Sequence, residues 1–413
     1  MKIFEINKYC RLCNSAKLEK VVQIGDTPVS EKYSDSKNQK PKDSLVPLDL
    51  YYCLECGHVQ IIHVVNPDFL WDKFTFKTSR NLKISQHYQN YVHDLVKFSG
   101  SEEKNFVIDV GSNDGTLLNI FKNNGFKKVL GVDPAKEIAE TATRNGIETI
   151  VGYFDTKIAN QIKDRFGLAD FVTANNVYAH INNMDEVTEA IKTVLSKKGI
   201  FSFEVSYLPD VIEKKLLGTI FHEHLSYHSI RPLIKFFEKK ELEIINVKRN
   251  DLQGGSIVCY VQKKGGGFNI NKSVKEILIY EEKCKINDLK TFQNFSQELY
   301  LLKTELNNLL DKLNKDDKKV AGFGSARSAT TLIKFLDIGN KFKFIVDDNK
   351  DKHYKFTPGS RIEVLPTDKI YEEKIDYLIV FAWEHFKKII KKNEKFSKNG
   401  GKFINLFPSI EII

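Results

Sequence analysis

One short segment constrains the fold of this chain more than any other. Three apolar residues surround Asp109 in the run from Val107 to Val110, which predicts a buried strand. The strand ends at Gly111, and Gly115 then precedes an apolar stretch that predicts a helix. A strand, a glycine turn and a helix start in this order present free backbone N–H groups to a ligand. The sequence therefore predicts a ligand-binding turn at the edge of an α/β sheet.

The glycine spacing argues against a dinucleotide site. The run from Asp109 to Gly115 is D-x-G-x-x-x-G, whereas dinucleotide-binding turns have the pattern G-x-G-x-x-G. It resembles the first motif of S-adenosylmethionine-dependent methyltransferases, which implies that Asp109 and Asn113 hold the methionine end of that cofactor. A second apolar strand ends at Asp133, whose carboxylate suits paired ribose hydroxyls. The alternative is a glycine turn with a chance aspartate in an unrelated α/β unit.

Predicted strands and helices alternate from Asn105 to Gln262, which is the pattern of a doubly wound sheet. At the exit of the third strand, Phe154 or Asp155 can flank adenine. Asn175 ends the fourth strand, at the carboxyl edge where such sheets bind ligands. His180 follows shortly afterwards, so it is a candidate for the same site, although a structural histidine is an equal alternative.

Four of the six cysteines form two C-x-x-C pairs. The four thiols of Cys10, Cys13, Cys53 and Cys56 predict a closed tetrahedral zinc site with a structural role. The N-terminus lacks the apolar core of an export signal, which favours metal binding over disulfides. Two reduced turns without metal, or a redox dithiol, are the alternatives, but a redox motif does not need a second copy.

The densest polar cluster of the chain is Phe221 to His228, which holds three histidines, a glutamate and a tyrosine. One interpretation is a general base whose pKa is tuned by the neighbouring Glu223. A second is a metal held by His222, His224 and His228, although this spacing differs from the helical H-E-x-x-H site. A purely structural role is the third interpretation, and burying three histidines without partners is costly.

The C-terminal part of the chain predicts a long helical region and a second α/β unit. No glycine or proline occurs from Asn271 to Lys319. Apolar residues there step by three and four, which predicts packing on the second lobe or, alternatively, a dimer contact. These residues are Phe292, Phe295, Leu299, Leu302, Leu306, Leu309 and Leu313. A strand, a G-x-G turn and a helix start then recur from Lys319 to Ser328, a pattern that can bind phosphate.

Composition limits the class of partner. The 413 residues carry a formal net charge of +9, but lysine dominates and no dense basic block stands out, so we expect no nucleic-acid partner. A positive balance still attracts an anionic substrate. No run approaches the ~18 apolar residues of a membrane span. We therefore expect a cytoplasmic protein without a membrane partner, and a monomer.

Taken together, the motifs resemble those of the zinc-containing, S-adenosylmethionine-dependent sugar C-methyltransferases that act on nucleotide-linked deoxy keto sugars. The resemblance covers nearly the whole chain. It is carried by the two cysteine pairs, Asp109–Gly115, Gly131–Pro134, Phe221–His224 with Tyr227, Gly254–Ser256, Gly322–Ala326 and Phe381–Trp383.

This resemblance implies an α/β fold with a central Rossmann-like class I methyltransferase domain, a small N-terminal zinc-binding module and a second, C-terminal Rossmann-like domain. The expected boundaries are 1–68 for the zinc-binding module, 69–104 for a helical connector, 105–265 for the S-adenosylmethionine-binding domain, 266–318 for a helical linker and 319–413 for a nucleotide-sugar-binding domain.

The resemblance also implies the chemistry. A ketone at C4 of the sugar acidifies the neighbouring C3–H, and His224 removes that proton before methylation of the carbon, with Glu223 and His180 in the active site. The implied cofactor residues are Asp109, Gly111, Asn113, Gly115, Asp133, Phe154 and Asn175. The implied substrate residues are Phe221, His222, Tyr227, Gly324, Ser325 and Arg327.

Two positions depart from the family pattern. Phe221 stands where the family has a tyrosine, and Phe74 or Phe76 aligns with a second family tyrosine. A lost phenol removes a hydrogen-bond donor near the substrate, which bears on the identity of the sugar and on the methylated atom. Methylation of an oxygen or of another anionic metabolite is the enzymatic alternative, and a non-catalytic binding protein is the alternative from another class.

Overall fold

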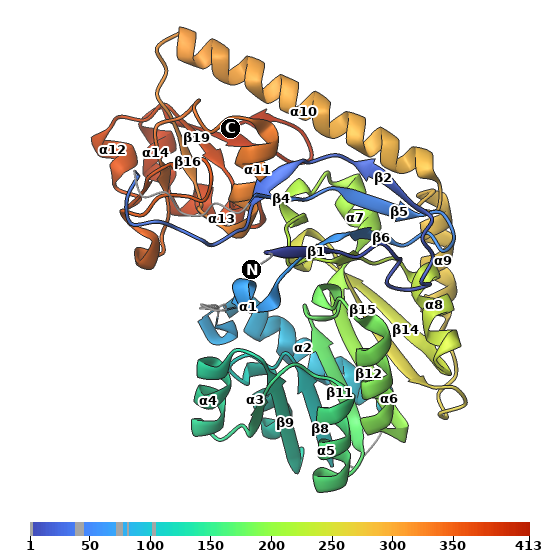
Figure 1. Cartoon of the computed structure of the whole chain (residues 1–413). Helices are drawn as coiled ribbons and strands as arrows, with labels where there is room; N and C mark the ends of the chain where they lie inside the picture. The colour runs from blue at the N-terminus through green and yellow to red at the C-terminus, as the bar shows by residue number, and fades with distance from the viewer. Residues whose placement is uncertain (1–2, 38–44, 72–76, 81, 101–104) are drawn as a thin grey trace.

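The computed structural model describes residues 3–37, 45–71, 77–80, 82–100 and 105–413. Two α/β units are joined by a long helix, and the N-terminal strands lie between the two units (Figure 1). Phe74 and Phe76 lie outside the described residues. Within the described part of the chain, no helix is long and apolar enough to cross a membrane.

The central unit contains a seven-stranded sheet. In spatial order its strands are β10 (Thr149–Val151), β9 (Lys128–Asp133), β8 (Phe106–Val110), β11 (Ala169–Asn175), β12 (Leu195–Ser206), β15 (Ser256–Lys263) and β14 (Leu242–Asn250). The first five pair in parallel, and β15 is antiparallel to both neighbours. The strand order reverses at β8, so the carboxyl ends of β8 and β11 form a switch point where such sheets bind ligands.

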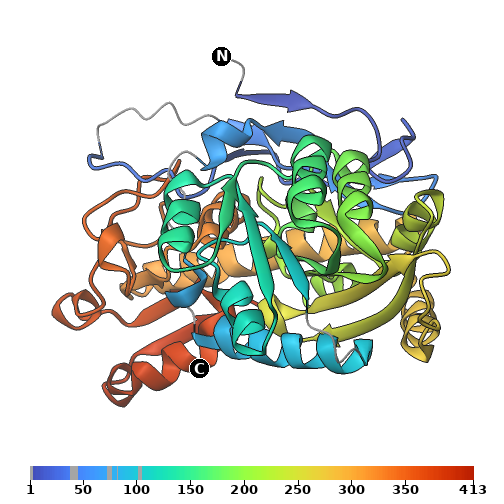
Figure 2. The same cartoon turned by 90° about the horizontal axis from the view of Figure 1, so that it is seen from below.

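Strand β8 is buried along its whole length because both faces of the sheet are covered. Ile108 and Val110 pack in one apolar cluster and Val107 in another, as the alternation of side chains along a strand requires. Figure 2 shows helices on both sides of this sheet. The cluster around Val107 includes α2 (Leu82–Ser99) and α3 (Thr116–Asn123). The cluster around Ile108 includes α5 (Thr156–Phe166), α6 (Met184–Val194) and α8 (Ile230–Lys239).

The N-terminal module takes one of its strands from the methyltransferase region. Its four-stranded sheet consists of β13 (Ser226–Tyr227), β6 (Val59–Ile61), β5 (Leu50–Cys53) and β2 (Leu18–Val22) in spatial order. Two smaller pairs are β1 (Phe4–Ile6) with β7 (His63–Val65) and β3 (Asp26–Pro28) with β4 (Leu45–Pro47). Because β13 begins two residues after His224, the predicted catalytic segment is fixed to the cysteine-bearing module by backbone hydrogen bonds.

The C-terminal unit is a second Rossmann-like sheet. Its strands, in spatial order, are β18 (Val364–Leu365), β17 (Ile345–Val346), β16 (Val320–Phe323), β19 (Tyr377–Val380), β20 (Lys402–Asn405) and β21 (Glu411–Ile412). All pair in parallel except β21. Its helices are α11 (Arg327–Leu336), α12 (Lys369–Glu372), α13 (Phe386–Lys392) and α14 (Glu394–Lys398).

Helices α9 (Lys272–Lys283) and α10 (Leu289–Lys315) connect the two units. Helix α10 packs against β2, α11 and β16 of the same chain, so its apolar stripe serves internal packing. Leu310 is fully buried, whereas the sequence pattern placed Leu309 in the stripe. The buried residues of α10 are Phe292, Phe295, Leu299, Leu302, Leu306, Leu310 and Leu313.

A tryptophan of the C-terminal unit packs directly on glycines of the central unit. A Cβ atom on Gly218 would lie 2.4 Å from Trp383 Nε1, and one on Gly254 would lie 2.7 Å from a carbon of the same indole. No larger residue allows this approach without movement, which explains glycine at both positions. The indole of Trp383 therefore fixes the C-terminal unit against the two turns that contain these glycines.

The substitution Gly218→Ala tests this contact. We expect a loss of about 1–3 kcal/mol of stability, because the new methyl group overlaps Trp383. The chain has two tryptophans, so in a Trp71→Phe background the fluorescence of Trp383 alone reports on the contact, and its emission should shift to longer wavelength. A Cβ on Gly25 meets nothing within 4 Å, so Gly25→Ala should leave this emission unchanged, although the φ of +83° makes alanine strained there as well. Unchanged fluorescence in the Gly218 variant would contradict the assignment.

Candidate active site

A cavity of about 350 Å³ lies where the three parts of the chain meet. The turn after β8 and the ends of β9 and β11 form one side. Val64 and Val65 of the N-terminal module contribute to the lining, as does Arg327 of the C-terminal unit. Sequence-predicted residues in the lining are Asp109, Gly111, Asn113, Asp133, Phe154, Asn175, His180, His222, Glu223 and Arg327. One cavity therefore brings together candidates for the cofactor and for the substrate.

The two glycines of the turn are required by backbone geometry and close packing. Gly111 has φ +71°, and a Cβ there would lie 2.3 Å from a methyl carbon of Val177. Gly115 has φ +76° and precedes α3, and its Cβ would meet Ile147 at 3.0 Å. Gly111 lines the cavity, whereas Gly115 shapes the turn from behind. Both positions are thus closed to residues with side chains.

Asp133 holds the turn from the neighbouring strand. The backbone N–H of Asn113 donates to Asp133 Oδ2 at 2.8 Å, and the N–H of Ala135 donates to Oδ1 at 2.8 Å. Each oxygen keeps a second acceptor position, which is the arrangement that a ribose diol needs. Burial raises the pKa of Asp133. Its carboxylate both fixes the turn and faces the cavity.

Asn113 is also engaged by the segment before α2. Its Oδ1 accepts hydrogen bonds from the backbone N–H of Thr78 at 3.0 Å and from the Thr78 hydroxyl at 3.3 Å. Thr78 lines the cavity as well, and sequence reasoning did not identify it. The predicted role of Asn113 at the methionine end is therefore shared with a structural one, since its side chain ties this segment to the turn.

Two further buried polar groups face the cavity. The hydroxyl of Thr173 donates to Asp109 Oδ1 at 2.6 Å, and burial raises the pKa of Asp109 to about 7. Among the described residues, no hydrogen-bond partner is found for either side-chain atom of Asn175, which is 7% exposed. Native proteins rarely leave buried amides unpaired. An orphaned amide beside an acidic turn fits a polar cofactor at this edge.

The two candidates for contact with adenine have different roles. Phe154 is buried and lines the cavity. Asp155 instead caps α5, where its side chain accepts a hydrogen bond from the N–H of Ile158 at 2.7 Å. Of the two residues, Phe154 alone is placed to pack against a ligand.

His224 is held in one tautomer by the backbone. Its Nδ1 lies 2.7 Å from the carbonyl oxygen of Thr219. Because a carbonyl only accepts, Nδ1 carries the proton and Nε2 keeps its lone pair. Burial lowers the pKa of His224 to about 4, so the ring is neutral at pH 7. This is the protonation state that a general base requires.

The ring of His224 lies between two other rings. Its centroid is 3.9 Å from that of Phe221, and it stacks on His180 at 5.1 Å. His180 and Glu223 line the cavity. His224, Phe221 and Tyr227 are not among the described residues that line it, and the rings of Phe221 and Tyr227 contact the ring of His224. His224 is partly exposed, and residues that line the cavity precede and follow it in the chain.

Glu223 faces a cation of the C-terminal unit. Its Oε1 lies 3.8 Å from Arg327 Nη1, and the two side chains line the cavity together. Burial raises the pKa of Glu223, and the charge of Arg327 acts in the opposite direction. Arg327 is the first residue of α11, so this helix brings a positive charge to the cavity from the far unit.

The three histidines of the cluster do not converge on one metal. His222 Nε2 donates to the carbonyl of Val46 at 3.0 Å, and the ring of His228 is fully buried beside His58. Within the described part of the chain, the four paired cysteines are the one group of three or more His, Cys, Asp or Glu residues with ligand geometry. The alternative of a histidine-bound metal therefore has no support in the structure.

The glycine turn of the C-terminal unit repeats the construction of the first. The N–H of Ser325 donates to Asp347 Oδ2 at 2.7 Å, as the N–H of Asn113 does to Asp133. Here, however, the turn is covered, because the Tyr33 hydroxyl and Lys352 Nζ donate to the Ser325 carbonyl at 2.5 and 2.6 Å. Gly324 and Ser325 are thus engaged within the protein, and Arg327 reaches the cavity.

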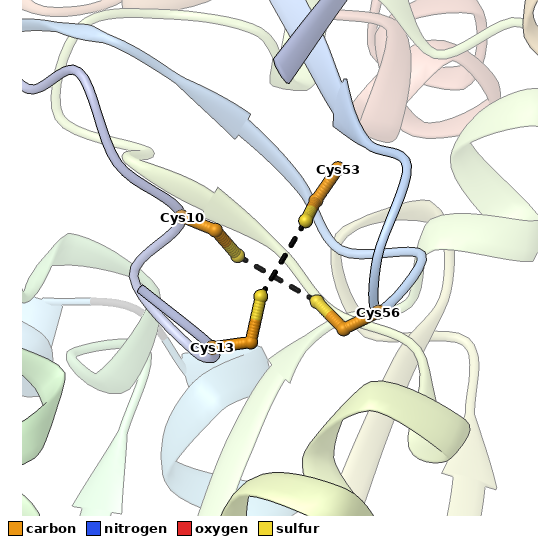
Figure 3. Close-up of side chains that lie close together, drawn as sticks. All are labelled: Cys10, Cys13, Cys53 and Cys56. Carbon is orange, nitrogen blue, oxygen red and sulfur yellow. Dashed lines mark hydrogen bonds between the residues drawn. The ribbon is translucent and has the colours of Figure 1, made fainter. Parts of the chain in front are cut away.

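The four paired cysteines form one cluster (Figure 3). Their sulfur atoms all lie within 4.8 Å of one another, with Cys10–Cys56 at 3.6 Å and Cys13–Cys53 at 3.5 Å. In a tetrahedral zinc site with Zn–S bonds of about 2.3 Å, neighbouring sulfurs are about 3.8 Å apart. The four thiols fit a structural zinc ion.

Arg11, inside the first cysteine turn, connects this cluster to the active-site segments. Its Nη1 donates to the carbonyls of Ile61 and Leu225 at 2.6 and 3.2 Å, and its Nε donates to Asn182 Oδ1 at 3.2 Å. Leu225 follows His224, and Asn182 lies two residues after His180. Sequence reasoning missed Arg11, whose signal is a charge between two cysteine ligands.

The substitution Cys10→Ser tests the metal site. We expect the variant to bind less than one zinc per chain and to unfold at lower temperature, because structural zinc contributes directly to folding. Zinc content by mass spectrometry and thermal unfolding measure both effects. Cys284 lies outside the cluster, so Cys284→Ser should keep its zinc. Full zinc content in the Cys10 variant would exclude the four-cysteine site.

The buried histidines make stability dependent on pH. Burial lowers the pKa of His222 and His224 to about 4 and that of His228 to about 3. An unfolded histidine titrates near 6.5, so below that pH the unfolded chain binds protons that the folded chain does not. Each of these histidines should therefore lower the free energy of unfolding as the pH is lowered below about 6.5, by up to about 1.4 kcal/mol per pH unit.

Denaturant unfolding between pH 7 and pH 5 measures this slope. His228→Asn should make the slope shallower, since it removes one buried group with a lowered pKa. The exposed His93 is the control, and His93→Gln should leave the slope unchanged. The difference between variant and wild type is the readout, because buried Asp109, whose pKa is raised to about 7, acts in the opposite direction over this range. A slope in His228→Asn equal to that of the wild type would show that the His228 ring is not buried in the neutral form.

Three family profiles match successive parts of the chain. Residues 10–71 match a family described as "Putative zinc binding domain", residues 84–247 match a methyltransferase domain, and residues 251–408 match a C-methyltransferase C-terminal domain. The order of these matches agrees with the N-terminal cysteine module, the central sheet and the second Rossmann-like unit.

The chain is 31% identical over 405 residues to the C-methyltransferase NovU of Streptomyces niveus, covering 98% of this chain and 96% of that protein. Among solved structures, it is similar to the PH0226 protein of Pyrococcus horikoshii OT3, with 15% identity, 47% of this chain and 98% of that chain covered and a TM-score of 0.37. It is also similar to magnesium protoporphyrin IX methyltransferase (ChlM) of Synechocystis PCC 6803 with bound SAH. The two are 15% identical, the match covers 46% of this chain and 89% of that chain, and the TM-score is 0.34.

The near full-length match to a C-methyltransferase and the three successive profiles lead to one assignment. The chain belongs to the family of S-adenosylmethionine-dependent C-methyltransferases that carry an N-terminal zinc-binding domain.

Proposed function

We propose that this C-methyltransferase acts on a nucleotide-diphosphate-linked deoxy keto sugar, and that His224 removes the proton next to the ketone. The supporting observation is the hydrogen bond from His224 Nδ1 to the Thr219 carbonyl, which leaves Nε2 free as a base. This base lies beside a cavity whose lining includes both the glycine turn after β8 and Arg327. A base, a cofactor turn and a cation suited to phosphate together match the needs of carbon methylation on such a sugar.

The cofactor residues have complementary roles in this proposal. Bound S-adenosylmethionine supplies an electrophilic methyl group on a sulfonium centre. Asp133 holds the ribose hydroxyls, Phe154 packs against adenine, and Asp109 with Asn175 binds the polar methionine end. Gly111 and Gly115 give the turn its shape, and Asn113 holds the turn to the segment before α2.

The proton transfer follows from the surroundings of His224. A ketone acidifies the adjacent C–H bond, and the neutral imidazole accepts that proton at Nε2 while Nδ1 stays bonded to Thr219. The carboxylate of Glu223 stabilises the imidazolium that forms, since opposite charges attract strongly in a site shielded from water. His180 stacks on the ring and limits its movement.

The substrate is bound from two sides in this proposal. Arg327 attracts the diphosphate, because it carries a positive charge and lines the cavity. Phe221, His222 and Tyr227 surround the sugar side. Gly324 and Ser325 act indirectly, by fixing the turn before α11.

Each segment of the chain has one role in this proposal. Residues 105–265 bind the cofactor and residues 319–413 bind the nucleotide. Residues 1–68, the connector 69–104 and the linker 266–318 hold the two together.

The substitution His224→Ala tests the proposed base. We expect kcat to fall by about 10²–10⁴-fold on a keto-sugar substrate, which is the usual contribution of a general base. S-adenosylmethionine binding, measured by calorimetry, should stay within about twofold, since the cofactor residues are elsewhere. His93→Gln, on the exposed side of α2, is the matched control.

The substrate for this test is identified beforehand. The wild-type protein is assayed with labelled S-adenosylmethionine and a panel of dTDP-, GDP- and CDP-linked keto sugars.

Hydrogen exchange separates proton removal from methyl transfer. In D2O with the sugar and S-adenosylhomocysteine, the wild-type protein should exchange the hydrogen next to the ketone, as seen by NMR. The His224→Ala variant should not. Full turnover or full exchange in this variant would overturn the assignment of the base.

A further inference from the structure

Gln253 has a backbone conformation that residues with side chains rarely adopt. Its φ and ψ angles are 51° and 32°, in the left-handed region, although Gly254 and Gly255 follow directly. Such strained positions occur mainly where the surrounding structure fixes them, and they cluster at functional sites. The conformation of Gln253 therefore calls for a physical explanation.

The loop around Gln253 is fixed by contacts on both sides. Gly254 lies under the indole of Trp383, and its carbonyl accepts a hydrogen bond from Lys214 Nζ at 2.6 Å. A Cβ on Gly255 would lie 2.3 Å from the carboxyl carbon of Asp210, which is itself paired with Arg249 at 2.6 Å. These contacts, from both α/β units, hold the backbone that carries the Gln253 side chain.

Gln253 is one of the residues that line the active-site cavity. It shares the lining with His180, Glu223 and Arg327. No hydrogen bond joins its carboxamide to another residue in the described part of the chain. The amide offers two donors and an acceptor, and it is neutral, so it matches a sugar hydroxyl or ketone oxygen better than a phosphate.

We propose that Gln253 is a specificity-determining residue that donates a hydrogen bond from its carboxamide to an oxygen of the sugar. This inference rests on the proposed function, since it requires a sugar in the cavity. The fixed loop holds the backbone of Gln253 in place before substrate binds, so that only the side chain loses freedom on binding. A site built to hydrogen-bond one oxygen discriminates strongly against substrates that lack it.

Two substitutions separate this role from a structural one. Gln253→Met keeps the size of the side chain and removes both donors, so kcat/KM should fall at least tenfold while the dissociation constant of S-adenosylhomocysteine stays unchanged. Gln253→Gly also removes the amide but relieves the backbone strain. Its melting temperature should rise while its kcat/KM falls, and a merely structural role does not produce this opposite change.

Asp317 provides the control. It also has a positive φ, of 53°, but it is exposed and is not among the residues that line the cavity. Asp317→Gly should raise the melting temperature and leave kcat/KM unchanged. If both Gln253 variants keep wild-type kcat/KM on a keto sugar that the wild type methylates, the inference is wrong and the proposed function stands. A wild type that methylates no keto sugar would overturn both.

Discussion

The buried guanidinium of Arg11 is the interaction on which the arrangement of the site depends. It joins the cysteine turn to the backbone carbonyl of Leu225, which follows His224, and to the side-chain amide of Asn182. Strand β13 adds backbone pairing with β6 at the same place. A zinc ion that closes the turn around Arg11 would therefore also hold the distant segment that carries His224, the proposed base. In the proposed mechanism, a metal with four cysteine ligands and no open position has this structural role and takes no part in the reaction.

The sequence predicts the local parts of this site well. The glycine turn at Asp109–Gly115, Asp133 and the two cysteine pairs each depend on a few neighbouring residues, whose geometry follows from backbone rules. The long-range contacts could not be predicted, because nothing local indicates them. Examples are the pairing of β13 with β6 and the approach of Arg327 to Glu223, which join segments more than 100 residues apart. Thr78 and Gln253 were missed for the same reason.

The two α/β units show how one construction serves two purposes. In each, the turn after the first strand donates an N–H to an aspartate at the end of the second strand. Around Asp133 the turn faces the cavity, whereas around Asp347 it is covered by Tyr33 of the N-terminal module. The two turns are built alike and differ in what packs over them. The second unit acts on the site through α11 and Trp383.

The central claim is that one cavity holds the methyl donor and the sugar, with His224 between the two segments that define it. A crystal structure of the complex with S-adenosylhomocysteine and a nucleotide-linked keto sugar tests it most directly. The account predicts the homocysteine compound over Asp109 and Asp133, and His224 Nε2 about 3–3.5 Å from the carbon next to the ketone. A sugar bound outside this cavity, or a reacting carbon beyond the reach of His224, would contradict it.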